Sequence, residues 1–454
     1  MILEKVKGSF RDPSGHLFYK KEKLLRVIRP IYKNHYEKLM ESGLYDQLIT
    51  EKKLIPHQEY KSETLSLSGE VYKIIEPEII PFVSYPYEWC FSQLKDAALL
   101  TLEIQKKAFS KGMVLKDASA YNVQFVDCRP VFIDTLSFEE YKPGDVWRAY
   151  KQFCQHFLAP LLLMRKDFRF SSMLKSEIDG ISLDFTRHQL GWKSYFSLGQ
   201  LLHIHLHSMA LNKYKLNEST RQLKISKNAF LGNLDSLTNT IKSIKLKKKK
   251  TQWGDYYSIT NYTDESFKHK ETVVRDMLQH SNPEKVWDFG ANNGHFSKIA
   301  AKQGAYTIAM DIDYLAVEKN YLANKTKTGI FPLQMNLCNP TPGLGWNNSE
   351  RESLMERGKV DMGMALALTH HLAISNNLPF DYIADFFSQC CDKLIVEFIP
   401  KSDSKVRFLL HSREDVYNDY NIDSFEKAFS TYFHISQKTP VKNSERTLYL
   451  MHKK

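Results

Sequence analysis

The chain has 454 residues, of which 43% are apolar and 25% charged, a composition that excludes wholesale disorder and suggests two or three domains. Its net charge of +11 is compatible with a nucleic-acid or anionic-membrane partner, but much of the excess lies in one lysine run over 242–250, which is typical of a solvated connector. No apolar run approaches the ~18 residues of a membrane span, and the first residues lack the apolar core of a signal peptide. Six cysteines without metal-site spacing predict free thiols and a cytoplasmic protein.

Residues 1–240 predict an α+β domain that becomes mostly helical after Asp145. The expected elements, in chain order, are a hairpin over 10–27, a helix over 32–48, short strands at 72–75 and near 82, a long helix over 89–110, and two short strands near 124 and at 131–133.

The lysine run marks the boundary between two parts of the chain. We place a linker at 241–252 and a second domain at 253–454, which begins with the aromatic segment 253–257.

The second domain alternates short apolar strands with segments of helical length. The expected strands are 285–288, 305–310, 331–335, 360–368 and 393–397, and the expected helices are 296–303, 314–324 and 380–390. This alternation predicts an α/β fold with a mostly parallel sheet and helices on both faces. Its ligand is then expected beyond the carboxyl ends of the strands.

A glycine-rich turn follows the first of these strands. Asp288 ends the strand, and the chain turns through Gly290 and Gly294 into the next helix. Glycines at such a turn permit positive φ and close approach of a ligand to the backbone. Asp311 ends the following strand, where a carboxylate can accept hydrogen bonds from two ribose hydroxyls. A plain turn in another kind of α/β protein is the alternative.

The pattern Asp288-Phe-Gly-Ala-Asn-Asn-Gly294, followed by Asp311, resembles the first two motifs of the class I, Rossmann-like methyltransferases. The resemblance implies S-adenosylmethionine as cofactor and no metal. Asp313 is a less favoured choice than Asp311 for the ribose. The implied cofactor-binding residues are Asp288, Gly290, Ala291, Asn292, Gly294, Asp311, Ile312, Asn336 and Leu337.

The segment after the fourth strand is expected to face the methyl acceptor. It contains His370 and His371, which resemble a pair found in many small-molecule methyltransferases, and a neutral imidazole can accept a proton from a hydroxyl. Helix capping is the alternative role. Glu397, Lys401 and Asp403 follow the fifth strand and are candidate substrate-binding residues at the mouth of the same cleft, or solvated loop charges.

A second constellation lies in the first domain. Asp117, Asn122 and Asp134 have the spacing of a kinase active site and resemble the catalytic loop of aminoglycoside-phosphotransferase-like kinases. The chain departs from that pattern at Lys116, where a His or Arg is usual, and at Thr135. A tight Asp/Asn turn, a repurposed acceptor-presenting lobe and an active kinase all remain open.

Several blocks, among them 8–15, 83–89, 115–122 and 396–401, resemble the bacterial methyltransferases related to the rhizobial nodulation methyltransferases. The resemblance spans nearly the whole chain and implies a methyltransferase without naming its acceptor. We expect a small molecule or hydroxyl-bearing metabolite. The alternatives are an RNA, tRNA or protein acceptor held by the basic surface, and a kinase-like fusion with an inactive kinase lobe.

Overall fold

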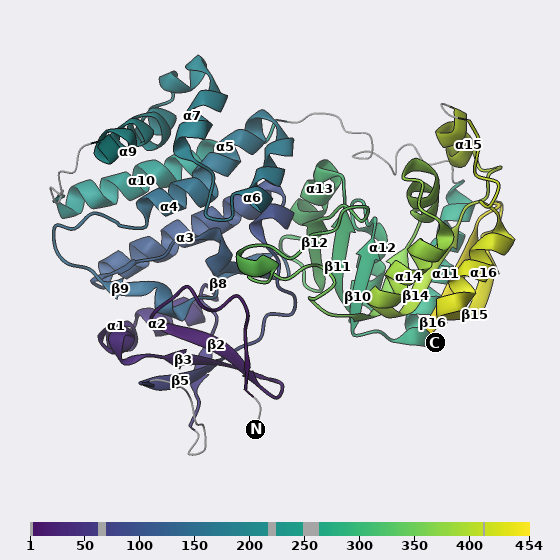
Figure 1. The fold of residues 1–454 in the computed structure, drawn as a ribbon, viewed down its shortest axis with the longest axis horizontal. Coiled ribbons are helices and arrows are strands. Elements are labelled where there is room, and N and C mark those ends of the chain that lie inside the picture. Colours follow the sequence, from purple (N-terminus) through teal and green to yellow (C-terminus); the bar gives the residue numbers. More distant parts are fainter. Residues whose placement is uncertain (1–2, 62–69, 217–223, 248–262, 412–413) are drawn as a thin grey trace. The chain divides into compact units, whose positions relative to one another are not determined.

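The computed structural model describes residues 3–61, 70–216, 224–247, 263–411 and 414–454 (Figure 1). The chain forms two compact units: unit 1 comprises Met1–Lys248 and Leu344–Arg351, and unit 2 comprises Lys249–Gly343 and Glu352–Lys454. The linker expected at 241–252 begins inside helix α10 (Lys227–Ser243). Residues 248–252 and the aromatic segment 253–257 lie outside the described residues.

Unit 1 begins with a five-stranded antiparallel sheet in the order β1-β2-β3-β5-β4. The expected hairpin over 10–27 is present as β2 and β3. Phe82, expected in a strand, lies in a loop between Pro81 and Pro86, whose missing N–H groups interrupt ladder pairing. The strands are β1 (Glu4–Lys5), β2 (Gly15–Lys20), β3 (Lys23–Ile28), β4 (His57–Glu59) and β5 (Lys73–Pro77).

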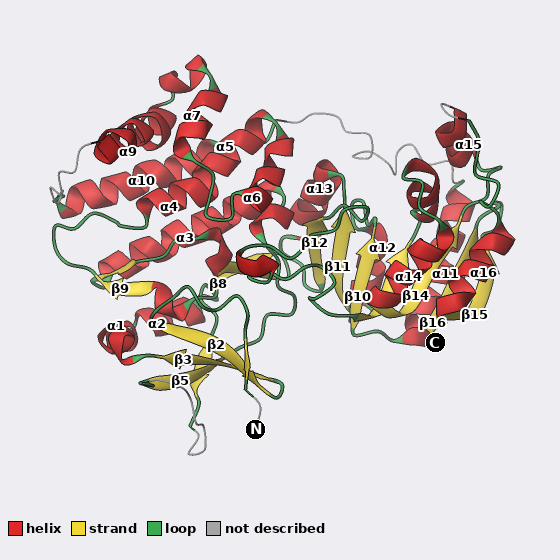
Figure 2. Ribbon diagram, viewed as in Figure 1, coloured by secondary structure: helices red, strands yellow, loops and turns green. Residues whose placement is uncertain are grey.

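Helices make up most of the rest of unit 1 (Figure 2). They are α1 (Lys33–Glu41), α2 (Leu44–Thr50), α3 (Phe91–Ser110), α4 (Tyr150–Phe153), α5 (Ala159–Lys166), α6 (Met173–Ser176), α7 (Leu183–Leu190), α8 (Leu198–Gln200), α9 (His207–Leu216) and α10. Two short antiparallel pairs follow α3: β6 (Met113–Leu115) with β9 (Phe138–Glu140), and β7 (Val123–Val126) with β8 (Arg129–Phe132).

The segment Leu344–Arg351, which we call the arm, belongs to unit 1 although the chain enters it from unit 2 and returns there. Leu344 and Arg351 close it through paired backbone hydrogen bonds of 2.9 Å. Glu350 is buried and accepts from Arg11 at 2.6 and 2.9 Å. The Arg351 guanidinium lies 4.3 Å from the centre of the Tyr121 ring. A charge-assisted bidentate pair and a cation–π contact therefore hold the arm on unit 1.

Unit 2 is built on a seven-stranded sheet in the order β12-β11-β10-β13-β14-β16-β15. The first five strands in this order are parallel, while β16 runs antiparallel to β14 and to β15. The strands are β10 (Lys285–Phe289), β11 (Tyr306–Asp311), β12 (Ile330–Gln334), β13 (Val360–Ala365), β14 (Cys391–Phe398), β15 (Phe433–Pro440) and β16 (Thr447–Lys453).

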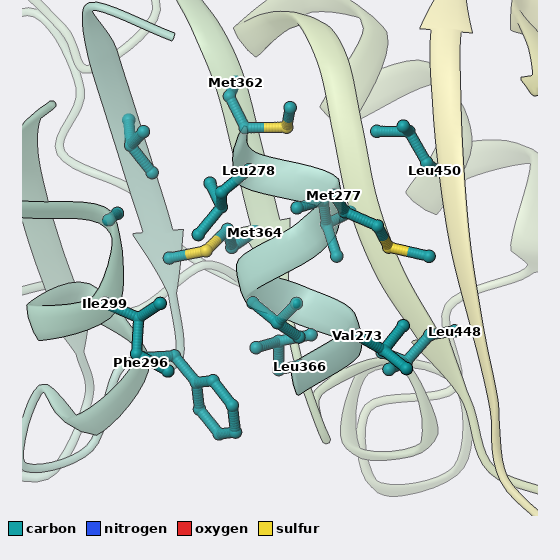
Figure 3. Packing of buried hydrophobic residues seen from close by; sticks show 14 of the residues in the cluster. Val273, Met277, Leu278, Phe296, Ile299, Met362, Met364, Leu366, Leu448 and Leu450 are labelled. Carbon is teal, nitrogen blue, oxygen red and sulfur yellow. The ribbon is translucent and has the colours of Figure 1, made fainter. Parts of the chain in front are cut away.

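Helices pack on both faces of this sheet because successive strand side chains point to opposite faces. On one face, Val273 and Met277 of α11 and Phe296 of α12 join the core formed with Met364 and Leu450 (Figure 3). On the other face, Phe387 of α14 packs against Phe289 with ring centres 5.2 Å apart, and Phe425 of α16 packs against Phe398 with ring centres 5.1 Å apart. The helices are α11 (Asp264–Ser281), α12 (His295–Lys302), α13 (Tyr314–Asn324), α14 (Phe380–Cys390), α15 (Ser404–His411) and α16 (Ile422–Tyr432).

Among the helices that the structure describes, none has both the length and the apolar character needed to cross a bilayer. All six cysteines are free thiols. Cys390 ends α14 and Cys391 begins β14, and both side chains are buried in the core, as their apolar neighbours predict.

Candidate functional site

The glycine turn after β10 has the left-handed backbone that its sequence predicts. Gly290, Asn292 and Gly294 have φ of 75°, 50° and 77°. The amides of Gly290 and Ala291 both donate to the Met310 carbonyl at 2.9 Å, which ties the turn to the end of β11. A Cβ on Gly294 would lie 2.5 Å from the Asn320 side chain, so this glycine also permits α12 to pack against α13.

Asp311 is held at the carboxyl end of β11 by the turn itself. Its Oδ2 accepts from the Asn292 amide at 2.7 Å and its Oδ1 from the Asp313 amide at 2.8 Å. A carboxylate can accept about four hydrogen bonds, so each oxygen retains acceptor capacity toward the cavity. Burial raises the pKa of Asp311 to about 6. Asp313 instead caps α13 by accepting from the Leu315 and Ala316 amides.

Asp288 is the second buried carboxyl group of this region. Its Oδ2 accepts from Ser297 Oγ at 2.6 Å. Burial raises the pKa of Asp288 to about 7, and the negative charge of Asp311 acts in the same direction. Two carboxyl groups with raised pKa values at one site favour a cationic ligand.

A cavity of about 350 Å³ opens at the carboxyl ends of the parallel strands of unit 2. This is the edge of the sheet where an open α/β fold binds its ligand. Residues of the glycine turn, of the ends of β11 and β12, and of the segment after β13 line it together. The lining comprises Phe267, Lys270, Asp288, Gly290, Ala291, Asn292, Phe296, Asp311, Ile312, Met335, Asn336, Leu337, Cys338, Leu366, Ala367, Leu368, His371, Leu372, Ser375, Asn376 and Leu409.

A buried ion pair supports one wall of the cavity. Lys270 Nζ donates to Glu397 Oε2 at 2.6 Å, and the same oxygen accepts from the Ala367 amide at 2.7 Å. Ala367 has a φ of 50°, which costs a non-glycine residue about 1–2 kcal/mol and persists because its surroundings enforce it. Arg446 lies on the far side of Glu397 and donates to Asp403 at 2.8 Å.

The two histidines after β13 have different surroundings. His371 lines the cavity, whereas His370 is buried outside the lining, with its ring centre 4.0 Å from that of His371. Burial lowers the pKa of His371 to about 4 and holds the pKa of His370 well below its usual value. Both imidazoles are therefore neutral near pH 7, and of the two only His371 borders the cavity.

The predicted cofactor residues line this cavity, with the exception of Gly294. Glu397 is fully buried behind Lys270 and Ala367 rather than at the cleft mouth. Asp403 is buried against Arg446, and Lys401 pairs with Asp415 at 2.8 Å.

Lys270 is a charged lining residue that sequence reasoning missed. It is buried on the apolar face of α11 with Val273, Val274 and Met277. A lysine at helical spacing within an apolar stripe was the available signal, because such a charge needs a buried partner.

The second predicted constellation assembles within unit 1. Asn122 Nδ2 donates to Ser137 Oγ at 3.1 Å, and Ser137 Oγ in turn donates to Asp134. Arg26 on β3 pairs with Asp134 at 2.5 Å. Burial raises the pKa of Asp117, and the nearby negative charge of Asp134 raises it further. The three predicted residues thus share one polar cluster, in which Arg26 neutralises Asp134.

The sheet of unit 2, numbered by strand within the unit, has the order 3-2-1-4-5-7-6 with strand 7 antiparallel. With a glycine turn after strand 1 and an acid after strand 2, this is the arrangement of the class I S-adenosylmethionine-dependent methyltransferases, and unit 2 is a methyltransferase domain of that class. Nodulation protein NoeA of Rhizobium meliloti (strain 1021) is 34% identical to the chain over 459 residues, which cover 98% of this chain and 95% of NoeA. The chain belongs to the NoeA family.

No family model matches the chain. Solved structures that match part of the chain include magnesium protoporphyrin IX methyltransferase ChlM from Synechocystis PCC 6803. It is 16% identical with a TM-score of 0.30, and the match covers 42% of this chain and 84% of the ChlM chain. N-methyltransferase NodS from Bradyrhizobium japonicum WM9 is 9% identical with a TM-score of 0.32 and covers 42% of this chain and 97% of its own.

Proposed function

We propose that unit 2 transfers the methyl group of S-adenosylmethionine to a hydroxyl group of a small molecule in the cytoplasm. The observation that carries the cofactor assignment is Asp311, a buried carboxyl group fixed by two backbone amides at the cavity wall. It would accept the two ribose hydroxyls, while Ile312, Asn336 and Leu337 border the adenine. The six free thiols support a reducing compartment.

The methionine part of the cofactor matches the charged end of the cavity. Asp288 and Lys270 both line it, and they offer opposite charges to an ammonium and a carboxylate group. The positive sulfonium would lie near the two buried carboxyl groups Asp288 and Asp311, which favour a cation. In this proposal Gly290 and Ala291 leave room for the ligand next to the backbone.

The acceptor side of the cavity is mainly apolar. Leu368, Leu372 and Leu409 line it, with His371 as a neutral imidazole among them. We assign His371 as the group that would accept the hydroxyl proton of the acceptor, while the bound cofactor would supply the methyl group. Exclusion of water and in-line placement by the apolar residues would contribute the larger part of the rate. His370 would act by positioning the His371 ring.

The first experiment is calorimetric titration of the full chain with S-adenosylmethionine. Asp311→Asn removes the charge that receives the ribose and is expected to weaken binding by roughly 2–4 kcal/mol. Asp313→Asn is the matched control, because asparagine also caps a helix and Asp313 does not line the cavity. No binding by the wild type, or equal loss in both variants, would contradict the assignment.

The acceptor class is tested with isotope-labelled cofactor. The protein is incubated with small-molecule, RNA and protein fractions of a cell extract, and the label is followed. We expect label in the small-molecule fraction, with transfer reduced in His371→Ala while cofactor affinity is retained. Label in the RNA or protein fraction would contradict a small-molecule acceptor and would support an RNA or protein acceptor instead.

For unit 1 we propose a kinase-like, acceptor-presenting lobe that does not transfer phosphate. The supporting observation is the ion pair between Arg26 and Asp134, which gives the carboxylate a protein partner in place of a nucleotide-bound cation. In a titration with magnesium and ATP, we expect no nucleotide binding that depends on Asp134, so the wild type and Asp134→Ala should behave alike. Such binding would instead support a true kinase lobe.

A further inference from the structure

Large apolar side chains are exposed together on the helical part of unit 1. Trp192, Phe196 and Leu198 are 68%, 81% and 69% exposed. Further exposed apolar residues follow at helical spacing along α8, the π-helical turns Leu201–Leu206 and the start of α9. We call the whole set the apolar patch, which consists of Trp192, Phe196, Leu198, Leu202, Leu206 and Met209.

The opposite side of the same helix is fixed to the body of unit 1. Ile204 is fully buried. His203 contacts Tyr150 Oη at 2.7 Å and Ser236 Oγ at 3.0 Å. His205 contacts Ser194 Oγ at 2.7 Å, which ties the helix to the 3-10 segment Trp192–Phe196. These contacts set the rotation of the helix, so the apolar patch cannot turn inward without breaking them.

Side chains of the apolar patch contact one another. The rings of Trp192 and Phe196 pack edge to face with centres 5.7 Å apart, and Lys193 Nζ lies 5.7 Å from the Trp192 ring centre. Figure 1 shows α7 and α9 at the end of unit 1 opposite the sheet that contains β2, β3 and β5. Within unit 1, the patch therefore belongs to the helical end.

The stretch of sequence that carries the apolar patch contains cations but no carboxylates. From Phe185 to Asn217 the sequence contains no aspartate or glutamate, and its cations are Arg187, Lys193, Lys213 and Lys215. The carboxylate just before this stretch, Asp184, pairs with Arg187 at 2.9 Å. On the neighbouring helix α10 the one carboxylate, Asp235, pairs with Lys106.

We propose that the apolar patch inserts into the surface of an anionic lipid bilayer. A surface that exposes Trp192 and Phe196 of the 3-10 segment Trp192–Phe196, with Lys193 between them, beside the leucines of the following helix has the composition of an interfacial membrane anchor. Lys193 would approach lipid phosphates while the apolar side chains enter the headgroup boundary. A second copy of the chain fits less well, because a symmetric pairing of this patch would bring the same cations together.

The test is co-sedimentation of the full chain with vesicles. Vesicles of phosphatidylcholine with about one third phosphatidylglycerol should bind the protein, and pure phosphatidylcholine should bind it roughly tenfold more weakly. Phe196→Ser combined with Leu198→Ser should lower binding to the anionic vesicles by roughly tenfold or more. The control is Ile31→Ser, which removes an apolar side chain that is 74% exposed outside the patch. It should bind as the wild type does.

Each other outcome overturns the proposal. Equal binding by the double variant and the wild type would remove the patch from any membrane role. If neither vesicle binds and sedimentation velocity shows a dimer that Phe196→Ser with Leu198→Ser dissociates, a second copy is the occupant. Because both residues are exposed, an unchanged melting temperature of the variant verifies that the fold is intact.

Discussion

Lys270 Nζ lies 2.6 Å from Glu397 Oε2, and this pair joins α11 to the end of β14 across 127 residues of sequence. Both side chains are buried, and the same carboxylate oxygen holds the Ala367 amide in its left-handed conformation. The shape of the cavity wall therefore depends on a buried charge pair.

Breaking this pair should be costly. Glu397→Gln leaves the Lys270 ammonium uncompensated in the core and should lower the free energy of unfolding by about 3–5 kcal/mol. Urea unfolding measures this loss. Lys270→Met combined with Glu397→Gln should recover part of it, since no unpaired charge remains. The exposed pair Lys401–Asp415 is the control, because Lys401→Met should cost about 1 kcal/mol or less. Equal losses in both pairs would argue against this account.

Cofactor affinity should rise with pH. Burial raises the pKa of Asp311 to about 6 and that of Asp288 to about 7, so both are largely protonated at pH 5 and ionise by pH 8. The ionised forms attract the cationic cofactor, and affinity should increase by up to about tenfold per pH unit for each carboxyl group involved. Calorimetry from pH 5 to 8 measures the slope. Asp311→Asn should flatten it and Asp313→Asn should not.

The same shifts predict the opposite trend for the free protein. A carboxyl group with a raised folded-state pKa stabilises the fold below its unfolded pKa of about 4 and loses that contribution as pH rises through the folded value. The free energy of unfolding contributed by Asp288 and Asp311 should thus fall between pH 5 and 8. Asp288→Asn should reduce this fall, as urea unfolding at several pH values would detect. A slope unchanged by the substitution would rule Asp288 out as its source.

Gly294 should resist substitution more than another glycine of similar backbone conformation. Gly294→Ala places a Cβ 2.5 Å from the Asn320 side chain, in addition to the cost of a positive φ. Gly304 has a φ of 97°, and no atom lies within 4 Å of the position that a Cβ would take, so Gly304→Ala carries the backbone cost alone. We expect about 1–2 kcal/mol for Gly304→Ala and a clearly larger loss for Gly294→Ala. Thermal unfolding measures the stability of both variants. A similar loss in the two would mean that the Asn320 side chain moves aside at little cost.

The cluster in unit 1 should behave as a structural element. Burial raises the pKa of Asp134, but Arg26 and Ser137 lower it more, so the net pKa is below its ordinary value. Asp134 therefore stabilises the fold above its unfolded pKa and loses this effect as pH falls through the folded value. Arg26→Met should destabilise unit 1 and make acid unfolding begin at higher pH, while cofactor affinity in unit 2 stays unchanged. A loss of cofactor affinity would contradict this separation.

Much of unit 2 could be predicted because its signals are local. The bounds expected for α13 and α14, 314–324 and 380–390, agree with the structure, as each is a compact apolar pattern with clear ends. The hairpin of β15 and β16 was missed because β15 is an edge strand with mostly polar residues, which carries little apolar alternation. Its antiparallel pairing to β16, and that of β16 to β14, depend on tertiary context.

The site residues also fall into those that a local motif predicts and those that only the fold brings together. Asp288, Gly290 and Asp311 lie on one turn and its neighbouring strand, so a short motif suffices to place them at the cavity. Lys270 and Glu397 meet only through the fold, and the depth of Glu397 in the core could not be inferred from its loop-flanking position. The sequence indicates where the ligand lies, but the support behind the wall becomes visible only in three dimensions.

Because of the arm, the two units cannot be separated cleanly as fragments of the chain. Since the chain passes from unit 2 into unit 1 at Leu344 and back after Arg351, no single cut separates one complete unit from the other. A fragment beginning after the lysine run would carry Glu350 without Arg11, and the complementary fragment would lose the charge that Arg11 binds. Exchanging either half of the chain alone would therefore break the contacts of the arm. We expect the two halves to be inherited together.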